Sequence, residues 1–173
     1  MAAGNTYTAI ATQTLGSAAA SVTFSSIPAT YTDLVLIVSN LATTSASQNI
    51  KLRVGNGSLD TGTNYSCTVL AGNGTSASSA RQSSVASMII GAFQFGTDSS
   101  QTTPFQVIAH IMNYSNTTTY KSVLSRDASS NQGTELFAGL WRSTSAIDTV
   151  SLLVTTSTLL AGTVATLYGI LAA

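Results

Sequence analysis

Residues 30–40 read TYTDLVLIVSN, and the centre of this stretch, Leu34 to Val38, is apolar at every position. A strand that packs one face on a core and turns the other to water alternates apolar and polar side chains. This strand therefore needs cover on both faces, whereas a two-sheet sandwich covers only its inner faces. The same surplus of apolar residues occurs in VASMIIGAF (85–93), FQVIAHIM (105–112), LFAGLW (136–141) and VSLLV (150–154). Loops, a third layer or a neighbouring subunit could supply the cover, and the rarity of exposed apolar patches on soluble monomers favours a subunit.

Alternating segments separated by clusters of Gly, Asn, Asp and Ser predict a chain built from strands. Because no crossover helices are predicted between them, these strands should pair antiparallel in a sandwich or a barrel. Residues 78–90, SSARQSSVASMII, also fit a short helix, although the β-branched content favours a strand. The predicted strands are Tyr7–Thr14, Ser21–Ser26, Leu34–Asn40, Asn49–Val54, Tyr65–Leu70, Val85–Phe93, Phe105–Asn113, Tyr120–Arg126, Leu136–Arg142, Thr149–Thr156 and Thr163–Ile170.

The composition indicates one folded domain over residues 1–173, with a short N-terminal arm at about residues 1–6. Only 7% of the residues are charged, six basic and six acidic, so the formal net charge is zero. Typical globular chains carry roughly 25% charged residues, and here Ser and Thr take their place. A hydrophobic content of 44% and a mean hydropathy of +0.31 exclude a disordered chain. Zero net charge promotes association, which suits a protein that works in an assembly.

The same composition argues against several partners. The lysines and arginines are scattered and form no basic run, so we expect no nucleic-acid binding. No apolar run approaches 18 residues, so no membrane partner is predicted. The N-terminal residues lack the pattern of a secretion signal, which predicts synthesis in the cytoplasm. Cys67 is the only cysteine, so no intramolecular disulfide is possible.

The residues that could carry chemistry are few, and we predict no enzyme, no metal and no cofactor. His110 is the only histidine, and we interpret it as a hydrogen-bonded strand residue. The six carboxylates could supply a glycosidase pair, but most lie in turn sequences, where short acids cap and bend the chain. VGNGSLDTGTNYS (54–66) loosely evokes calcium ligation through Asn56 and Asp60, but a hairpin with an Asn-Gly turn is the better interpretation. Trp141 is interpreted as a core residue, and Arg142 as an interface or turn residue.

Three segments together resemble small structural proteins of tailed bacteriophages, especially cyanophages. They are YTAIATQTLGSAAASVTFSSIPATYTDLVLIVS (7–39), NYSCTVLAGNGTSASSARQSS (64–84), and AGLWRSTSAIDTVSLLV (138–154) with GTVATLYGI (162–170). The resemblance implies an all-β fold, an antiparallel jelly-roll sandwich of about 8–10 strands. It also implies a virion protein without a catalytic motif, either a capsid cement (decoration) protein or part of a tail fibre.

The cement interpretation is preferred, because the sequence shows no fibrous shaft or attachment domain. A cement protein is expected on the outer capsid surface, with the major capsid protein as partner and a homotrimer as its own assembly. The tail-fibre alternative would recognise host glycan, with Tyr31, Tyr65, Tyr114 and Tyr120 as candidates for stacking on sugars. The predicted interface residues are Leu34, Leu36, Val38, Tyr120 and Arg142.

Overall fold

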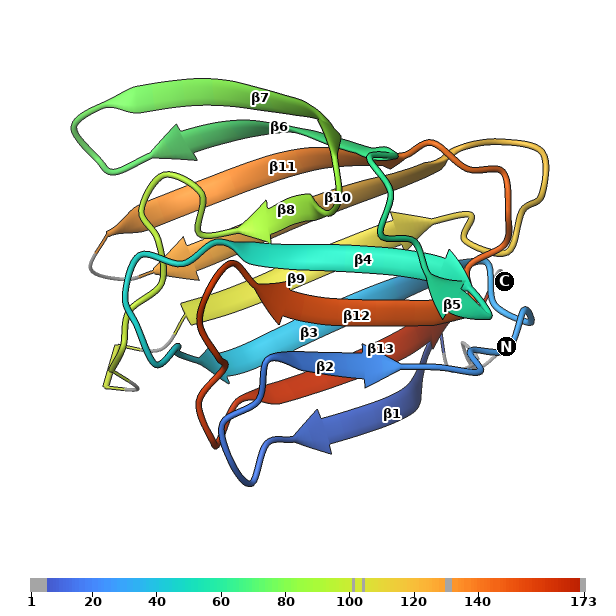
Figure 1. Ribbon diagram of the computed structural model, residues 1–173, viewed down its shortest axis with the longest axis horizontal. Coiled ribbons are helices and arrows are strands. Elements are labelled where there is room, and N and C mark those ends of the chain that lie inside the picture. Colours follow the sequence, from blue (N-terminus) through green and yellow to red (C-terminus); the bar gives the residue numbers. More distant parts are fainter. Residues whose placement is uncertain (1–5, 101, 104, 130–131, 172–173) are drawn as a thin grey trace, which may run out of the picture.

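Residues 6–100, 102–103, 105–129 and 132–171 are described by a computed structural model, in which two antiparallel β-sheets pack face to face (Figure 1). The predicted arm falls almost wholly outside these residues. The strands are β1 (Tyr7–Thr14), β2 (Ser21–Phe24), β3 (Asp33–Leu41), β4 (Ile50–Asn56), β5 (Ser58–Leu59), β6 (Tyr65–Gly72), β7 (Ala77–Val85), β8 (Met88–Gly91), β9 (Phe105–Met112), β10 (Lys121–Ser129), β11 (Gly133–Trp141), β12 (Thr149–Val154) and β13 (Val164–Ile170).

The larger sheet has the strand order β1-β13-β3-β9-β10-β11-β6-β7, and the smaller sheet has the order β2-β12-β4-β5, with β8 also paired to β4. The prediction of an all-β antiparallel sandwich is confirmed. Figure 1 shows the smaller sheet in front of the larger one, with β6 and β7 extending past its edge. No helix in the described part of the chain is long and apolar enough to cross a membrane.

The ambiguous segment 78–90 forms two strands and no helix. The single strand predicted over Val85–Phe93 is wrong, because β7 ends at Val85 and β8 begins at Met88 in the other sheet. β7 pairs only with β6 and is the edge of the larger sheet, whereas all four residues of β8 are buried. The chain thus changes sheets at the end of this segment, and a nine-residue strand followed by a four-residue strand takes the place of the single one.

The core lies between the two sheets and covers one of the two apolar faces of β3. Leu34, Leu36 and Val38 of β3 point inward and are fully buried. Leu52 of β4 and Leu152 of β12 belong to the same core cluster from the facing sheet. The alternate residues of β3 therefore face the outside of the larger sheet, since successive side chains of a strand point to opposite faces.

The predicted Asn-Gly hairpin is confirmed at the start of the glycine-rich segment. Asn56 pairs with Ser58 across the turn, and Gly57 has a φ of 71°, which favours glycine. The backbone N–H of Gly57 donates to both carboxylate oxygens of Asp148, at 2.8 and 2.9 Å. This turn is therefore held by a side chain distant in sequence as well as by its own conformation.

Gly169 of β13 leaves room for the ring of Tyr31. A Cβ at this position would stand 2.2 Å from Cγ of Tyr31, closer than any packed pair of carbons. Gly169→Ala is expected to lower the free energy of unfolding by about 1–3 kcal/mol, because the ring must leave its packed position. Urea unfolding measures this loss. The control is Gly16→Ala, since a Cβ at Gly16 meets nothing within 4 Å. Equal stability of the two variants would contradict the prediction, and adding Tyr31→Ala should make Gly169→Ala harmless.

Candidate interaction surface

The outer face of the larger sheet carries most of the exposed apolar side chains. Seven large hydrophobic residues in the described chain are substantially exposed, and five of them lie on this face. The smaller sheet covers only the inner face of the larger sheet, so no strand of the described chain packs on these residues. The five residues are Tyr7, Leu70, Met112, Leu124 and Leu136.

Strand register brings these residues together. Leu70 on β6 is opposite Leu136 on β11, which is opposite Arg126 on β10, and Arg126 is in turn opposite Ile108 on β9. A second row runs beside the first, where Val35 of β3 is opposite His110 and His110 is opposite Leu124. We call this set the outer patch, and it consists of Tyr7, Val35, Leu70, Ile108, His110, Met112, Leu124, Arg126 and Leu136.

Two shallow depressions cross the outer patch. One, of about 190 Å³, is lined by residues that include Tyr7, Ile108 and Leu124. The other, of about 400 Å³, reaches Leu70 at the far side. Both are lined by Arg126 and Leu136, so they form one open groove across several strands. Such a groove suits contact with another protein better than enclosure of a small molecule, which needs a deeper cleft.

The charges of the outer patch are sparse and uneven. Nε2 of His110 lies 2.9 Å from Oδ2 of Asp33, and Oδ1 of Asp33 accepts the backbone N–H of Asn113 at 2.6 Å. His110 is therefore a hydrogen-bonded strand residue, as predicted. Arg126 stands at the centre of the patch with an exposed side chain, and among the described residues it makes no ion pair.

The structure separates the residues predicted to form an interface. Leu34, Leu36 and Val38 are fully buried between the sheets, so the structure places them in the core and out of reach of a partner. The prediction chose the wrong face of the strand. β3 is apolar on both faces, and the residues that point outward are those that alternate with Leu34, Leu36 and Val38. Tyr120 is 54% exposed in the loop before β10. Arg142 donates from its guanidinium to the carbonyl oxygens of Thr63 and Tyr65 and so holds a loop.

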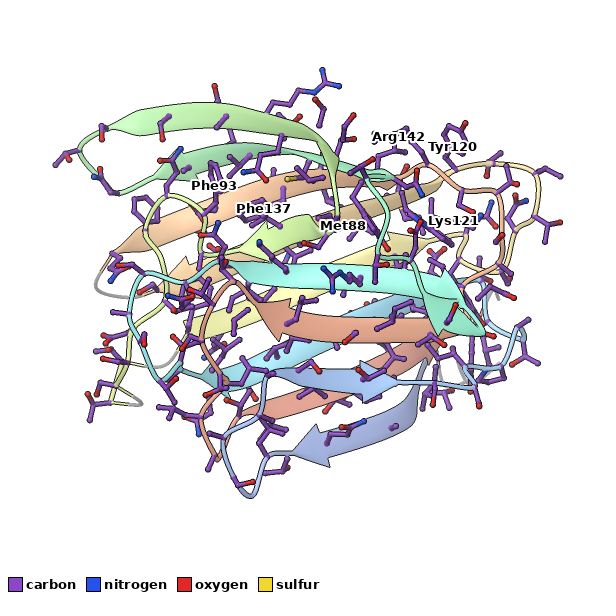
Figure 2. The ribbon with its side chains drawn as sticks, viewed as in Figure 1. Met88, Phe93, Tyr120, Lys121, Phe137 and Arg142 are labelled. Carbon is purple, nitrogen blue, oxygen red and sulfur yellow. The ribbon has the colours of Figure 1, made fainter. Side chains whose placement is uncertain are left out.

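Figure 2 shows Tyr120 and Arg142 at the same end of the sandwich. At this end Lys121 is fully buried, and its Nζ donates to the carbonyl oxygens of Thr119 and Thr144. Burial lowers the pKa of this lysine. Lys121 therefore joins two loops. Of the predicted interface residues, Tyr120 is the one whose side chain is exposed at this end and available to a partner.

The acidic side chains are engaged in holding the fold. Asp60 accepts hydrogen bonds from Gly62, Asn64 and the indole of Trp141. Burial acts to raise the pKa of its carboxyl, but these bonds together outweigh it and lower the pKa. A calcium ion would have to displace these donors. Trp141 itself is buried, as predicted. Within the described residues, no group of three or more His, Cys, Asp or Glu side chains is placed to hold a metal ion.

Asp127 and Glu135 form a close, buried carboxylate pair. They are 3% and 2% exposed and lie opposite each other on β10 and β11. Glu135 accepts the N–H groups of Phe93 and Gln94 at 2.7 and 2.6 Å, and Asp127 accepts that of Ala92 at 2.6 Å. A glycosidase pair must reach a sugar in a cleft, whereas this pair faces the segment that follows β8.

Sequence reasoning did not single out Leu70, Leu124, Leu136 or Arg126. A signal was present in KSVLSRDAS (121–129), where Leu124 and Arg126 occupy the same face as Ser122. A lone leucine on a polar face carries little weight until its cross-strand neighbours are known.

Comparison with protein-family models, curated proteins and solved structures gave no significant match.

Proposed function

We propose that this chain is a capsid cement protein of a tailed bacteriophage, which binds the outside of the major capsid shell and stabilises it. The observation that carries the proposal is the outer patch. An apolar sheet face with five exposed large side chains is what a subunit needs in order to dock on another protein. The resemblance to small phage structural proteins points to the shell as the partner.

The strand order supports a jelly-roll fold for this subunit. Within the larger sheet β1, β13, β3 and β9 are neighbours, and within the smaller sheet β2, β12, β4 and β8 are neighbours. Numbered along the chain as eight strands, these are the orders 1-8-3-6 and 2-7-4-5, which a jelly roll has. Of the remaining strands, β5 pairs with β4 in the smaller sheet, and β10, β11, β6 and β7 extend the larger sheet. They carry Leu70, Leu124, Arg126 and Leu136, so the additions to the eight-strand frame supply much of the outer patch.

The shortage of charge supports docking over a wide area. Each charged group buried in an interface must be desolvated, and this costs free energy unless a partner is in place. A surface rich in Ser, Thr and apolar residues avoids most of that cost. Binding only to the assembled shell would stabilise the shell by mass action.

We include a homotrimer in the proposal, since a charge-poor subunit is expected to meet copies of itself on the shell. Size-exclusion chromatography with light scattering should give a mass near three times 17.7 kDa at micromolar concentration. A stable monomer under these conditions would remove the trimer from the proposal.

Electron microscopy of the virion tests the function directly. The proposal expects density for this fold on the outside of the capsid, in hundreds of copies per particle by quantitative gel staining. Density on the tail, in tens of copies or fewer, would replace the proposal with its alternative. Absence of the protein from purified virions would overturn both.

The alternative is a tail-fibre or receptor-binding module that recognises host glycan. Tyr7 is 56% exposed at the rim of the groove, and its ring meets that of Tyr168 edge-on at 6.1 Å. Exposed aromatic rings stack on sugars, and this pair favours the alternative. Two of the tyrosines predicted for that role, Tyr65 and Tyr114, are fully buried and unsuitable.

A further inference from the structure

Arg126 is a cation surrounded by apolar side chains. It lies between Ile108 and Leu136 in the cross-strand row, with Leu124 two residues away on the same strand. Its side chain is exposed, and in the described part of the chain it has no ion pair or hydrogen bond. A charge placed in the middle of an apolar face weakens that face as a purely hydrophobic contact. Its position therefore needs a reason.

The outer patch offers Arg126 no carboxylate. Asp33 is the one acid that the described residues place on this face, and His110 and Asn113 already engage its oxygens. Asp127 and Glu135, although adjacent to the patch in sequence, point into the protein. A second exposed cation, Arg81 on β7, lies on the same face. It is three strands away and therefore roughly 15 Å from Arg126.

We propose that the outer patch binds a segment of a partner protein in which a carboxylate is flanked by apolar side chains, with the carboxylate on Arg126. This inference rests on the proposed function, and in that case the segment belongs to the shell. The apolar side chains would fill the two depressions on either side of Arg126, which Leu124 and Leu70 line. Once they are in place, water is excluded and the charge-assisted hydrogen bonds of the guanidinium are stronger than in solvent.

A second copy of this chain is a poor occupant of the same face. Two outer patches packed against each other would bring Arg126 onto apolar side chains or near another arginine, because the face has no free carboxylate. Like charges brought together in an interface cost free energy and suppress the wrong partner. Contacts between copies must therefore use another surface, and the outer patch is left for a different protein.

Selection of random 12-residue peptides on the immobilised protein tests the inference without the shell. The expected result is a family of peptides with Asp or Glu between apolar residues. Arg126→Gln should bind them about 10- to 100-fold more weakly, the range expected for losing a charge-assisted hydrogen bond. Arg126→Lys should fall between the two, because lysine keeps the charge and loses the planar fork. Peptides without acids, or equal binding by Arg126→Gln, would overturn the inference.

A second measurement separates this inference from the proposed function. Purified shells that lack the protein are mixed with the wild-type chain, Arg126→Gln and Arg53→Gln, which removes the same charge from the other sheet. Weaker binding by Arg126→Gln alone supports the inference. Equal binding by all three leaves the proposed function standing and overturns the inference. Failure of the wild-type chain to bind overturns the proposed function, and the peptide selection then decides the inference.

Alginate, which has carboxylates without apolar groups, should bind more weakly than the peptides, and tighter binding would overturn the choice of a protein partner.

Discussion

Raising the pH from 6 to 8 is expected to lower the free energy of unfolding by about 1–3 kcal/mol, because one buried carboxyl must give up its proton. That carboxyl is Asp127. Burial raises its pKa to about 8, and the neighbouring carboxylate of Glu135 acts in the same direction. An unfolded aspartate has a pKa of about 3.9, so the folded protein holds this proton far more tightly. The stability it gives is complete below about pH 4 and is lost as the pH rises through about 8.

The loss should begin where the carboxylate pair holds the chain. Together Asp127 and Glu135 accept the backbone N–H groups of Ala92, Phe93 and Gln94, which follow β8. When both are ionised, the neighbouring carboxylates of Asp127 and Glu135 repel each other, because the protein interior screens charge poorly. Hydrogen exchange of these three amides should therefore speed up between pH 6 and 8 by more than the general base-catalysed rate.

Asp127→Asn is the variant that tests this prediction. Asparagine has nearly the same shape and cannot ionise, so its free energy of unfolding should stay level from pH 6 to 8. Two controls locate the effect. His110→Gln removes the only histidine, and Cys67→Ala removes a thiol whose pKa burial raises. Both should keep the fall seen in the wild-type protein. A wild-type stability that is level or rises over this range would contradict the assignment of the proton to Asp127.

Much of the fold follows from local patterns. Strands such as Tyr7–Thr14 and Phe105–Met112 were predicted to within a residue, because each alternates or is bounded by turn residues. The weakest prediction concerned Ala77–Val85, read ASSARQSSV, which lies at a sheet edge and is largely exposed. None of its residues is fully buried and only Ala80, Gln82 and Val85 are partly covered, so its alternation is weak, and its partner β6 determines its conformation. Conversely, the four buried residues of β8 form a run too short to separate from the strand before it.

The sequence predicted that an apolar outer face exists, but it did not predict which residues form it. The surplus of apolar residues predicted a second apolar face, and three of the segments that are apolar on both faces, 34–38, 105–112 and 136–141, lie in the larger sheet. Which residues of each segment face outward depends on register, and a shift of one residue exchanges the two faces. Leu34, Leu36 and Val38 were assigned to the wrong face for this reason. Val35 lies on the outer face instead.

Replacing both Leu124 and Leu136 with serine is expected to weaken binding to the shell at least about 100-fold, since each central apolar side chain of an interface can contribute 1–2 kcal/mol or more. The two side chains are 46% and 50% exposed in the isolated subunit, so the fold should lose little stability. Co-sedimentation with shells that lack the protein measures the binding, and thermal unfolding checks the fold. The matched control is Tyr120→Ser, which removes a side chain that is 54% exposed at the end of the sandwich.

The three proteins together distinguish two docking geometries. If the sheet face is the contact, the double variant loses binding and Tyr120→Ser keeps it. If the loop end of the sandwich is the contact, Tyr120→Ser loses binding and the double variant keeps it, and the outer patch then has no part in docking.

The isolated double variant should also be more soluble than the wild-type chain, because two exposed leucines on a protein of zero net charge favour association. A gain in solubility together with unchanged binding would mean that the apolar face promotes aggregation and takes no part in assembly.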